Sequence, residues 1–93
     1  MVVDMETAGA SGATCITTAG AGKKNYISKL VISVDTAGLV TLSDGIGALY
    51  MPANNPVVIT FDPPKAQDNT NTGITCTNAG GGNFAVIARV FQL

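Results

Sequence analysis

Residues 83–93 read Asn-Phe-Ala-Val-Ile-Ala-Arg-Val-Phe-Gln-Leu, and they follow three glycines at 80–82. This stretch is rich in β-branched and aromatic residues, which favour strands. Successive side chains of a strand point to opposite faces, and Arg89 is the only charged residue on either face. A strand with one solvated face normally alternates apolar with polar residues, which this one does not do. We therefore predict a strand with both faces covered, one by the protein's own core and the other by a second copy of the chain.

The composition agrees with a small protein that associates. The 93 residues make one domain, 46% hydrophobic and only 12% charged. Ordinary soluble domains contain about 25% charged residues. Either partners permanently occupy a surface with so little charge, or Thr, Ser and Asn supply its polar groups instead.

Short β-rich runs alternate with turn residues from residue 13 onward, at a spacing typical of an all-β sandwich without helices. Residues 1–12 end in Thr-Ala-Gly-Ala-Ser-Gly, and we predict a flexible, poorly packed N-terminal arm there, followed by a single β-sandwich domain at 13–93. Pro63 and Pro64 are expected to end a strand because proline lacks the N–H donor of the ladder. The expected strands, about seven, cover residues 13–18, 25–34, 39–43, 46–51, 57–61, 74–78 and 83–93.

Groups suited to catalysis or cofactor binding are sparse. The chain has no histidine, which is the usual general base, and most of its six acidic residues lie in or beside predicted turns. A net charge of −1 disfavours nucleic acid and anionic membranes as partners. No segment approaches the ~20 apolar residues of a transmembrane helix. We predict no enzymatic activity, no cofactor or metal, and neither a nucleic-acid nor a membrane partner.

Cys15 and Cys76 are the only cysteines. Without histidine, two thiolates cannot complete the tetrahedral shell of zinc. A disulfide and two buried free thiols both remain open. The N-terminus lacks the basic start and continuous apolar run of a signal peptide, so we expect the chain to stay in the cytoplasm in which it is made, which favours free thiols.

The alternation of side chains between the two faces of each strand indicates which residues are candidates for a contact. Arg89 interrupts one face of the last strand, where it either pairs with a carboxylate at a contact with a second copy or another protein, or extends into water from an exposed strand end. Lys29 lies between Ile27 and Val31 on an earlier strand and has the same two interpretations. The candidate subunit-interface residues are Ile87, Arg89, Phe91, Leu93, Ile27, Lys29 and Val31.

The layout from residue 13 to 93 has a recurring form. An Ala/Gly loop ending in lysine precedes the strand Tyr-Ile-Ser-Lys-Leu-Val-Ile-Ser-Val, and a hairpin ends in Leu-Val-Thr-Leu-Ser-Asp-Gly. Then come Pro-Val-Val-Ile-Thr-Phe-Asp-Pro-Pro before a loop, Gly-Ile-Thr-Cys-Thr-Asn, a glycine run and the terminal apolar strand. In this layout the chain resembles the small jelly-roll virion proteins of tailed bacteriophages.

The resemblance implies an antiparallel two-sheet sandwich with jelly-roll topology, often assembled as a tumour-necrosis-factor-like homotrimer whose last strand is central in the subunit-facing sheet. It implies a capsid decoration (cement) protein on the outside of the virion, with the major capsid protein as partner. The alternative is a receptor- or carbohydrate-binding knob of a fibre or spike, which would need aromatic platforms, and only Tyr26 and Tyr50 are available for this. No shaft repeat is present to carry a knob, which favours cement. The candidate capsid contacts are Met1, Val2, Val3 and Met5 of the arm.

Overall fold

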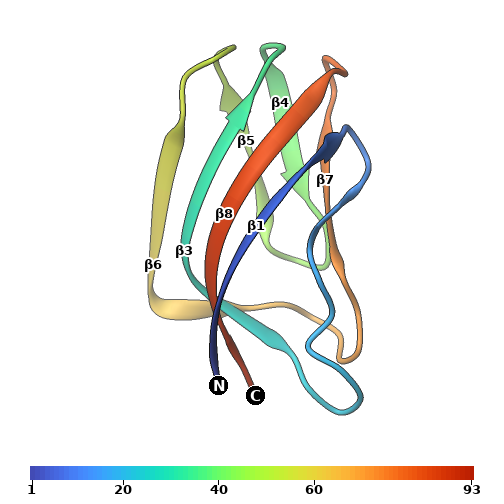
Figure 1. The fold of residues 1–93 in the computed structure, drawn as a ribbon, viewed down its shortest axis with the longest axis vertical. Helices are drawn as coiled ribbons and strands as arrows, with labels where there is room; N and C mark the ends of the chain where they lie inside the picture. The colour runs from blue at the N-terminus through green and yellow to red at the C-terminus, as the bar shows by residue number, and fades with distance from the viewer.

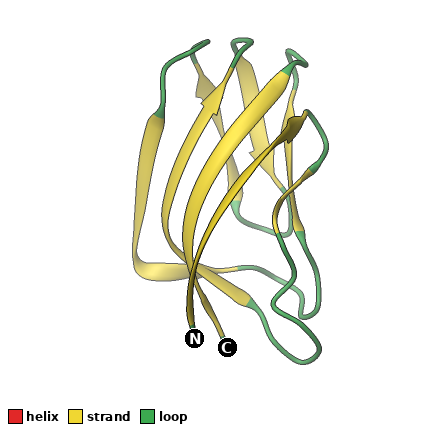
Figure 2. Cartoon of the chain, viewed as in Figure 1, coloured by secondary structure: helices red, strands yellow, loops and turns green.

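A computed structural model describes residues 1–93 as strands and loops (Figure 2). It contains no helix, and so none long enough to cross a membrane. The predicted all-β class is confirmed, with one strand more than expected. The strands are β1 (Val2–Ala10), β2 (Thr14–Ile16), β3 (Asn25–Val34), β4 (Gly38–Leu42), β5 (Gly47–Met51), β6 (Val57–Ala66), β7 (Ile74–Asn78) and β8 (Asn83–Gln92).

The strands form two four-stranded antiparallel sheets that pack as a sandwich (Figure 1). One sheet has the order β1-β8-β3-β6 and the other β2-β7-β4-β5. The pairing is nested: β1 pairs with β8, β2 with β7, β3 with β6 and β4 with β5. The chain is therefore arranged like one long hairpin that has been rolled up, and β8 becomes an inner strand between β1 and β3.

The core lies between the sheets and takes one face of each long strand. On β8 the buried side chains alternate with exposed ones, and those of Phe84, Val86, Ala88 and Val90 are at most 5% exposed. The other face of β8 has no cover within the chain. The full core comprises Cys15, Ile16, Ile27, Leu30, Ile32, Val34, Val40, Leu42, Ile46, Met51, Ile74, Cys76, Phe84, Val86, Ala88 and Val90.

The N-terminal segment differs from its prediction. Residues 1–12 were expected to form a poorly packed arm, but β1 pairs with β8 along its whole length, from Val2 opposite Phe91 to Ala10 opposite Asn83. Exposed and half-buried residues alternate along β1, as they do in an edge strand with one face on the core. Gly9, which suggested flexibility, lies close to its neighbours, since a Cβ there would lie 3.2 Å from the Cβ of Ala13.

Strand β3 carries a bulge that changes which residues face the core. Ile27 pairs with Val90 and Lys29 with Arg89, so Ser28 is an extra residue opposite β8. The Ser28 hydroxyl donates to the carbonyl of Arg89 at 3.1 Å. Beyond the bulge the parity is reversed, so that Ile27 is fully buried while Lys29 is exposed.

Strand β6 continues through the two prolines that were expected to end it. Lys65 lies opposite Ile27 and Thr60 opposite Lys29, so residues 61–64 form a wide bulge opposite Ser28. Because β6 is an edge strand, Pro63 and Pro64 interrupt no ladder on its outer side. The strand bends there and then runs across the lower end of the molecule, where it still pairs with the start of β3 (Figure 1).

One buried polar side chain ties the loops at the end of the sandwich together. Gln67 is 1% exposed. Its amide oxygen accepts a hydrogen bond from the backbone N–H of Asn25 at 2.7 Å. Its amide nitrogen donates to the Asp44 carboxylate at 2.7 Å and to the Thr72 carbonyl at 2.8 Å. Gln67 thus connects the start of β3 with the loops that follow β4 and β6.

Candidate functional site

The candidate site is the outer face, defined as the side of the β1-β8-β3-β6 sheet that points away from the core. Strand register arranges its side chains in rows across the sheet. The central row is apolar: Ile87 lies beside Val31, and Val31 beside Val58. Ile87 is 53% exposed and Val58 60% exposed. Glu6 of β1 ends this row next to Ile87.

The next row carries most of the charge. It consists of Asp4, Arg89, Lys29 and Thr60 on successive strands. The Arg89 guanidinium donates two hydrogen bonds to the Asp4 carboxylate, at 2.8 and 3.2 Å. These hydrogen bonds lower the pKa of Asp4 below its usual value. The predicted carboxylate partner of Arg89 is therefore present, but it comes from the same chain, and both side chains remain more than half exposed.

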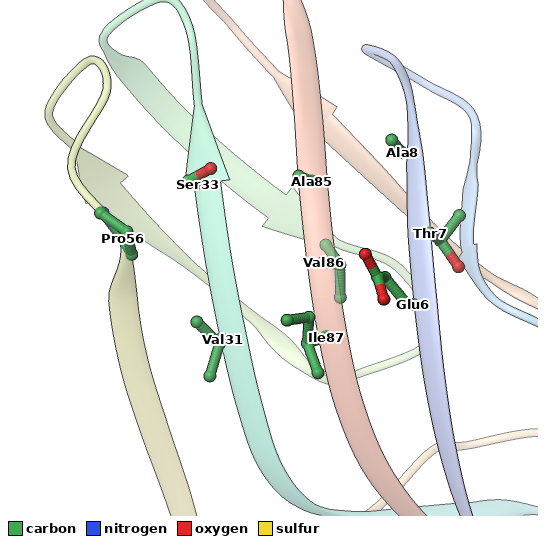
Figure 3. Close-up of a pocket in the computed structure, with 9 residues that line it drawn as sticks. All are labelled: Glu6, Thr7, Ala8, Val31, Ser33, Pro56, Ala85, Val86 and Ile87. Atoms are coloured by element: carbon green, nitrogen blue, oxygen red, sulfur yellow. The ribbon is translucent and has the colours of Figure 1, made fainter.

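Above the apolar row the outer face is hollowed because its side chains are small (Figure 3). Ala8, Ala85 and Ser33 lie side by side there, and Glu6 and Ile87 form the lower rim. The hollow has a volume of about 500 Å³. Pro56, which directly precedes β6, lies at its side (Figure 3).

The lower end of the outer face, beside the two termini, is also apolar. Val2, Phe91 and Tyr26 lie side by side on neighbouring strands. A second hollow of about 400 Å³ lies between Tyr26, Phe91, Leu93 and the two prolines of β6. Exposed apolar groups are concentrated at this end: Met1 is 74%, Val2 52% and Leu93 63% exposed.

The predicted contact residues divide into three groups. The outer face brings Ile87, Arg89, Lys29 and Val31 together, and Phe91 and Leu93 join Met1 and Val2 at its lower end. Val3 and Met5 point the other way and pack against the core. Ile27 was assigned to the subunit interface together with Lys29 and Val31, and this assignment is wrong because the bulge at Ser28 turns its side chain into the core.

Sequence reasoning missed the acidic edge of the face, Asp4 and Glu6, and the hydrophobic Val58 of β6. The first omission follows from the prediction of an arm, although the apolar Val3 and Met5 alternate with the acidic Asp4 and Glu6, which was a signal for a strand. For Val58 no sequence signal was available, because a single apolar residue on a strand does not indicate which sheet face will stay open.

Elsewhere the chain has few reactive groups, and no cluster of three potential metal ligands is formed. Cys15 and Cys76 are free thiols buried in the core on neighbouring strands. A hydrogen bond with Cys76, together with burial, raises the pKa of the Cys15 thiol. No protein family, characterised protein or solved structure matches this chain. The function is therefore inferred from the outer face and the fold.

The acidic groups predict how stability depends on pH. The pKa of Asp44 is lowered chiefly by its hydrogen bond from Gln67, and that of Asp35 by the backbone N–H of Asn83 at 2.8 Å. Because these carboxylates and Asp4 are more acidic in the folded than in the unfolded chain, the unfolded chain binds protons first as the pH falls.

We expect a melting temperature that is constant from about pH 7 to 5 and decreases below about pH 4. Thermal denaturation across this pH range tests the expectation, and Asp44→Asn should make the melting temperature depend less on pH. A melting temperature that rises on acidification would contradict the expectation.

Proposed function

We propose that this protein is a structural component of a tailed-phage virion, a decoration protein that forms a homotrimer through its outer face and binds the major capsid protein on the outside of the head. The exposed apolar row in the middle of that face carries the proposal. Ile87 and Val58 are more than half exposed in the middle of a regular four-stranded sheet, and Val31 lies between them. Contiguous apolar surface of this kind marks an interaction site.

The topology supports the proposal. A jelly roll is an eight-stranded double sheet in which strands pair in a rolled-up arrangement. The nested pairing of β1 with β8, β2 with β7, β3 with β6 and β4 with β5 is compatible with this form. The inner position of β8 agrees with the subunit-facing strand that the phage resemblance implies. The trimeric state itself comes from that resemblance.

The lower end of the sandwich is the proposed shell contact. Met1, Val2 and Leu93 are exposed there, next to the hollow between Tyr26 and Phe91. This end lies on the same sheet as the proposed subunit contact but two rows away from Ile87, so a trimer can present three such ends to one shell. Repeating a weak contact by symmetry raises the overall affinity through avidity.

The first test is the solution mass of the protein by light scattering and sedimentation velocity under reducing conditions. We expect a mass near three chains, and at least tenfold weaker association for Ile87→Glu, because the carboxylate would have to be desolvated in the contact. Tyr50→Glu is the matched control, since Tyr50 is 82% exposed but belongs to β5 of the opposite sheet. A single-chain mass at millimolar concentration would reject the trimer.

The second test is co-sedimentation of the purified protein with phage heads. The heads are prepared from the phage whose genome carries this gene, after the gene has been deleted. Saturable binding to the heads would support decoration. Binding to a glycan array with no binding to heads would instead favour the receptor-binding alternative, for which the hollow beside Tyr26 and Phe91 offers an aromatic platform.

A further inference from the structure

The two cysteines of the chain are buried on neighbouring strands at one edge of the sandwich. Strand β2 is the edge strand of the β2-β7-β4-β5 sheet, and its residue Cys15 is 0% exposed. Cys76 belongs to the adjacent strand β7 and is 1% exposed. Both are free thiols, and both lie in the sheet opposite to the one that carries the outer face. Their chemistry is therefore separate from the proposed subunit contact.

A bulge in β2 turns the two thiols toward each other. The ladder with β7 shifts register between Thr14 and Ile16, so Cys15 between them is an extra residue. In a regular strand Cys15 and Ile16 would point to opposite faces, but both are fully buried. The Cys15 side chain thus points into the core, as that of Cys76 does, and the two thiols share a hydrogen bond.

This arrangement is compatible with the geometry of a disulfide. Neighbouring strands are about 4.8 Å apart, and the Cα atoms joined by a disulfide are about 4.4–6.8 Å apart. The backbone of Cys76 is held on the β2 side by two hydrogen bonds, from its N–H to the Ala13 carbonyl at 3.1 Å and from the Gly12 N–H to its carbonyl at 2.8 Å. Because the sulfurs already contact each other, bond formation needs rotation of side chains and no rearrangement of strands.

We infer that Cys15 and Cys76 form an intramolecular disulfide when the protein meets a low-molecular-weight disulfide such as oxidised glutathione. One cysteine thiolate attacks a sulfur of oxidised glutathione, and one glutathione thiolate leaves. The other cysteine then attacks the cysteine sulfur of this mixed disulfide and displaces the second glutathione thiolate. The two cysteine protons end on the two released glutathione thiols, so the cysteines are oxidised and the glutathione is reduced.

The edge position of β2 gives the oxidant access to the buried sulfurs. Strand β2 has three residues and lies between the loops 11–13 and 17–24, and elements of this kind open locally at a lower free energy than global unfolding. The disulfide would enclose β3, β4, β5 and β6, and a cross-link around a long loop restricts the unfolded chain strongly. The bond therefore fastens the edge strand and stabilises the whole sandwich.

The test is to incubate the native protein with excess oxidised glutathione, block the remaining thiols under denaturing conditions and measure the intact mass. We expect a chain that is two hydrogen atoms lighter and carries no blocking group, and that dithiothreitol returns to the form with two thiols. The melting temperature of the oxidised form should exceed that of the reduced form by about 8 °C or more.

Cys76→Ala is the matched control, because it keeps Cys15 but cannot close the bond. Samples of this variant with and without oxidised glutathione should melt at the same temperature, and comparing them removes the effect of the lost core side chain. An unchanged mass of the original protein, glutathione on each cysteine or cross-linked chains would overturn the inference. An oxidised form that melts no higher than the reduced form would also overturn it. The bond forms within one chain, so this test does not depend on the oligomeric state.

Discussion

Replacing Gln67 by leucine is expected to lower the free energy of unfolding by about 3 kcal/mol. The substitution keeps the volume of the side chain but removes three hydrogen bonds, to the Asn25 N–H, the Asp44 carboxylate and the Thr72 carbonyl. Each buried group that loses its partner costs about 1–3 kcal/mol. Urea denaturation at neutral pH measures the difference.

Gln92→Leu is the matched control for this prediction. Gln92 is half-buried, and its side-chain nitrogen donates one hydrogen bond, to the Asn25 side chain at 3.2 Å. We expect this variant to lose about 1 kcal/mol or less, as for one neutral hydrogen bond. If Gln67→Leu and Gln92→Leu were equally stable, the loops at that end of the sandwich would not depend on Gln67.

Ile27→Ala is expected to cost about 3 kcal/mol, whereas Val31→Ala should cost less than about 1 kcal/mol in the dilute, monomeric protein. Both residues are β-branched and belong to β3. Ile27 is 0% exposed in the core, but Val31 is half-buried on the outer face. Truncating Ile27 leaves a cavity, while the surface at Val31 can be filled by water.

This comparison tests the bulge directly. In a strand without a bulge, residues 27 and 31 point to the same face, and their truncations would have similar effects. Denaturation must be measured at concentrations where the chain is monomeric, since association would bury Val31. Equal losses for the two variants would mean that Ser28 does not interrupt the alternation.

Much of the fold could be predicted from local patterns. The strand at 25–34 and that at 74–78 have the bounds expected from runs of β-branched residues between turns. The buried set of β8, which includes Phe84 and Val90, is one of the two faces that alternation defines. These features follow from residues close together in the chain, so a local rule captures them.

The candidate site was predicted less completely. The structure places Ile87, Arg89, Lys29 and Val31 on one sheet face but puts Ile27 in the core, and Asp4 and Glu6, which also lie on that face, were assigned to an arm. The Arg89 partner could not be identified, because Asp4 is at the other end of the chain and meets Arg89 only through the pairing of β1 with β8.

By itself, the sequence determined the all-β class, most strand positions and the apolar character of both faces of β8, since propensity and alternation act over a few residues. Only the tertiary structure decided that β1 is a strand, that Ser28 reverses the parity of β3 and that β6 continues past Pro63. Each of these depends on the backbone hydrogen-bonding groups of the neighbouring strand. Backbone groups must find partners across a ladder, and an edge, an extra residue or a proline is tolerated or excluded according to neighbours that are far away in the sequence.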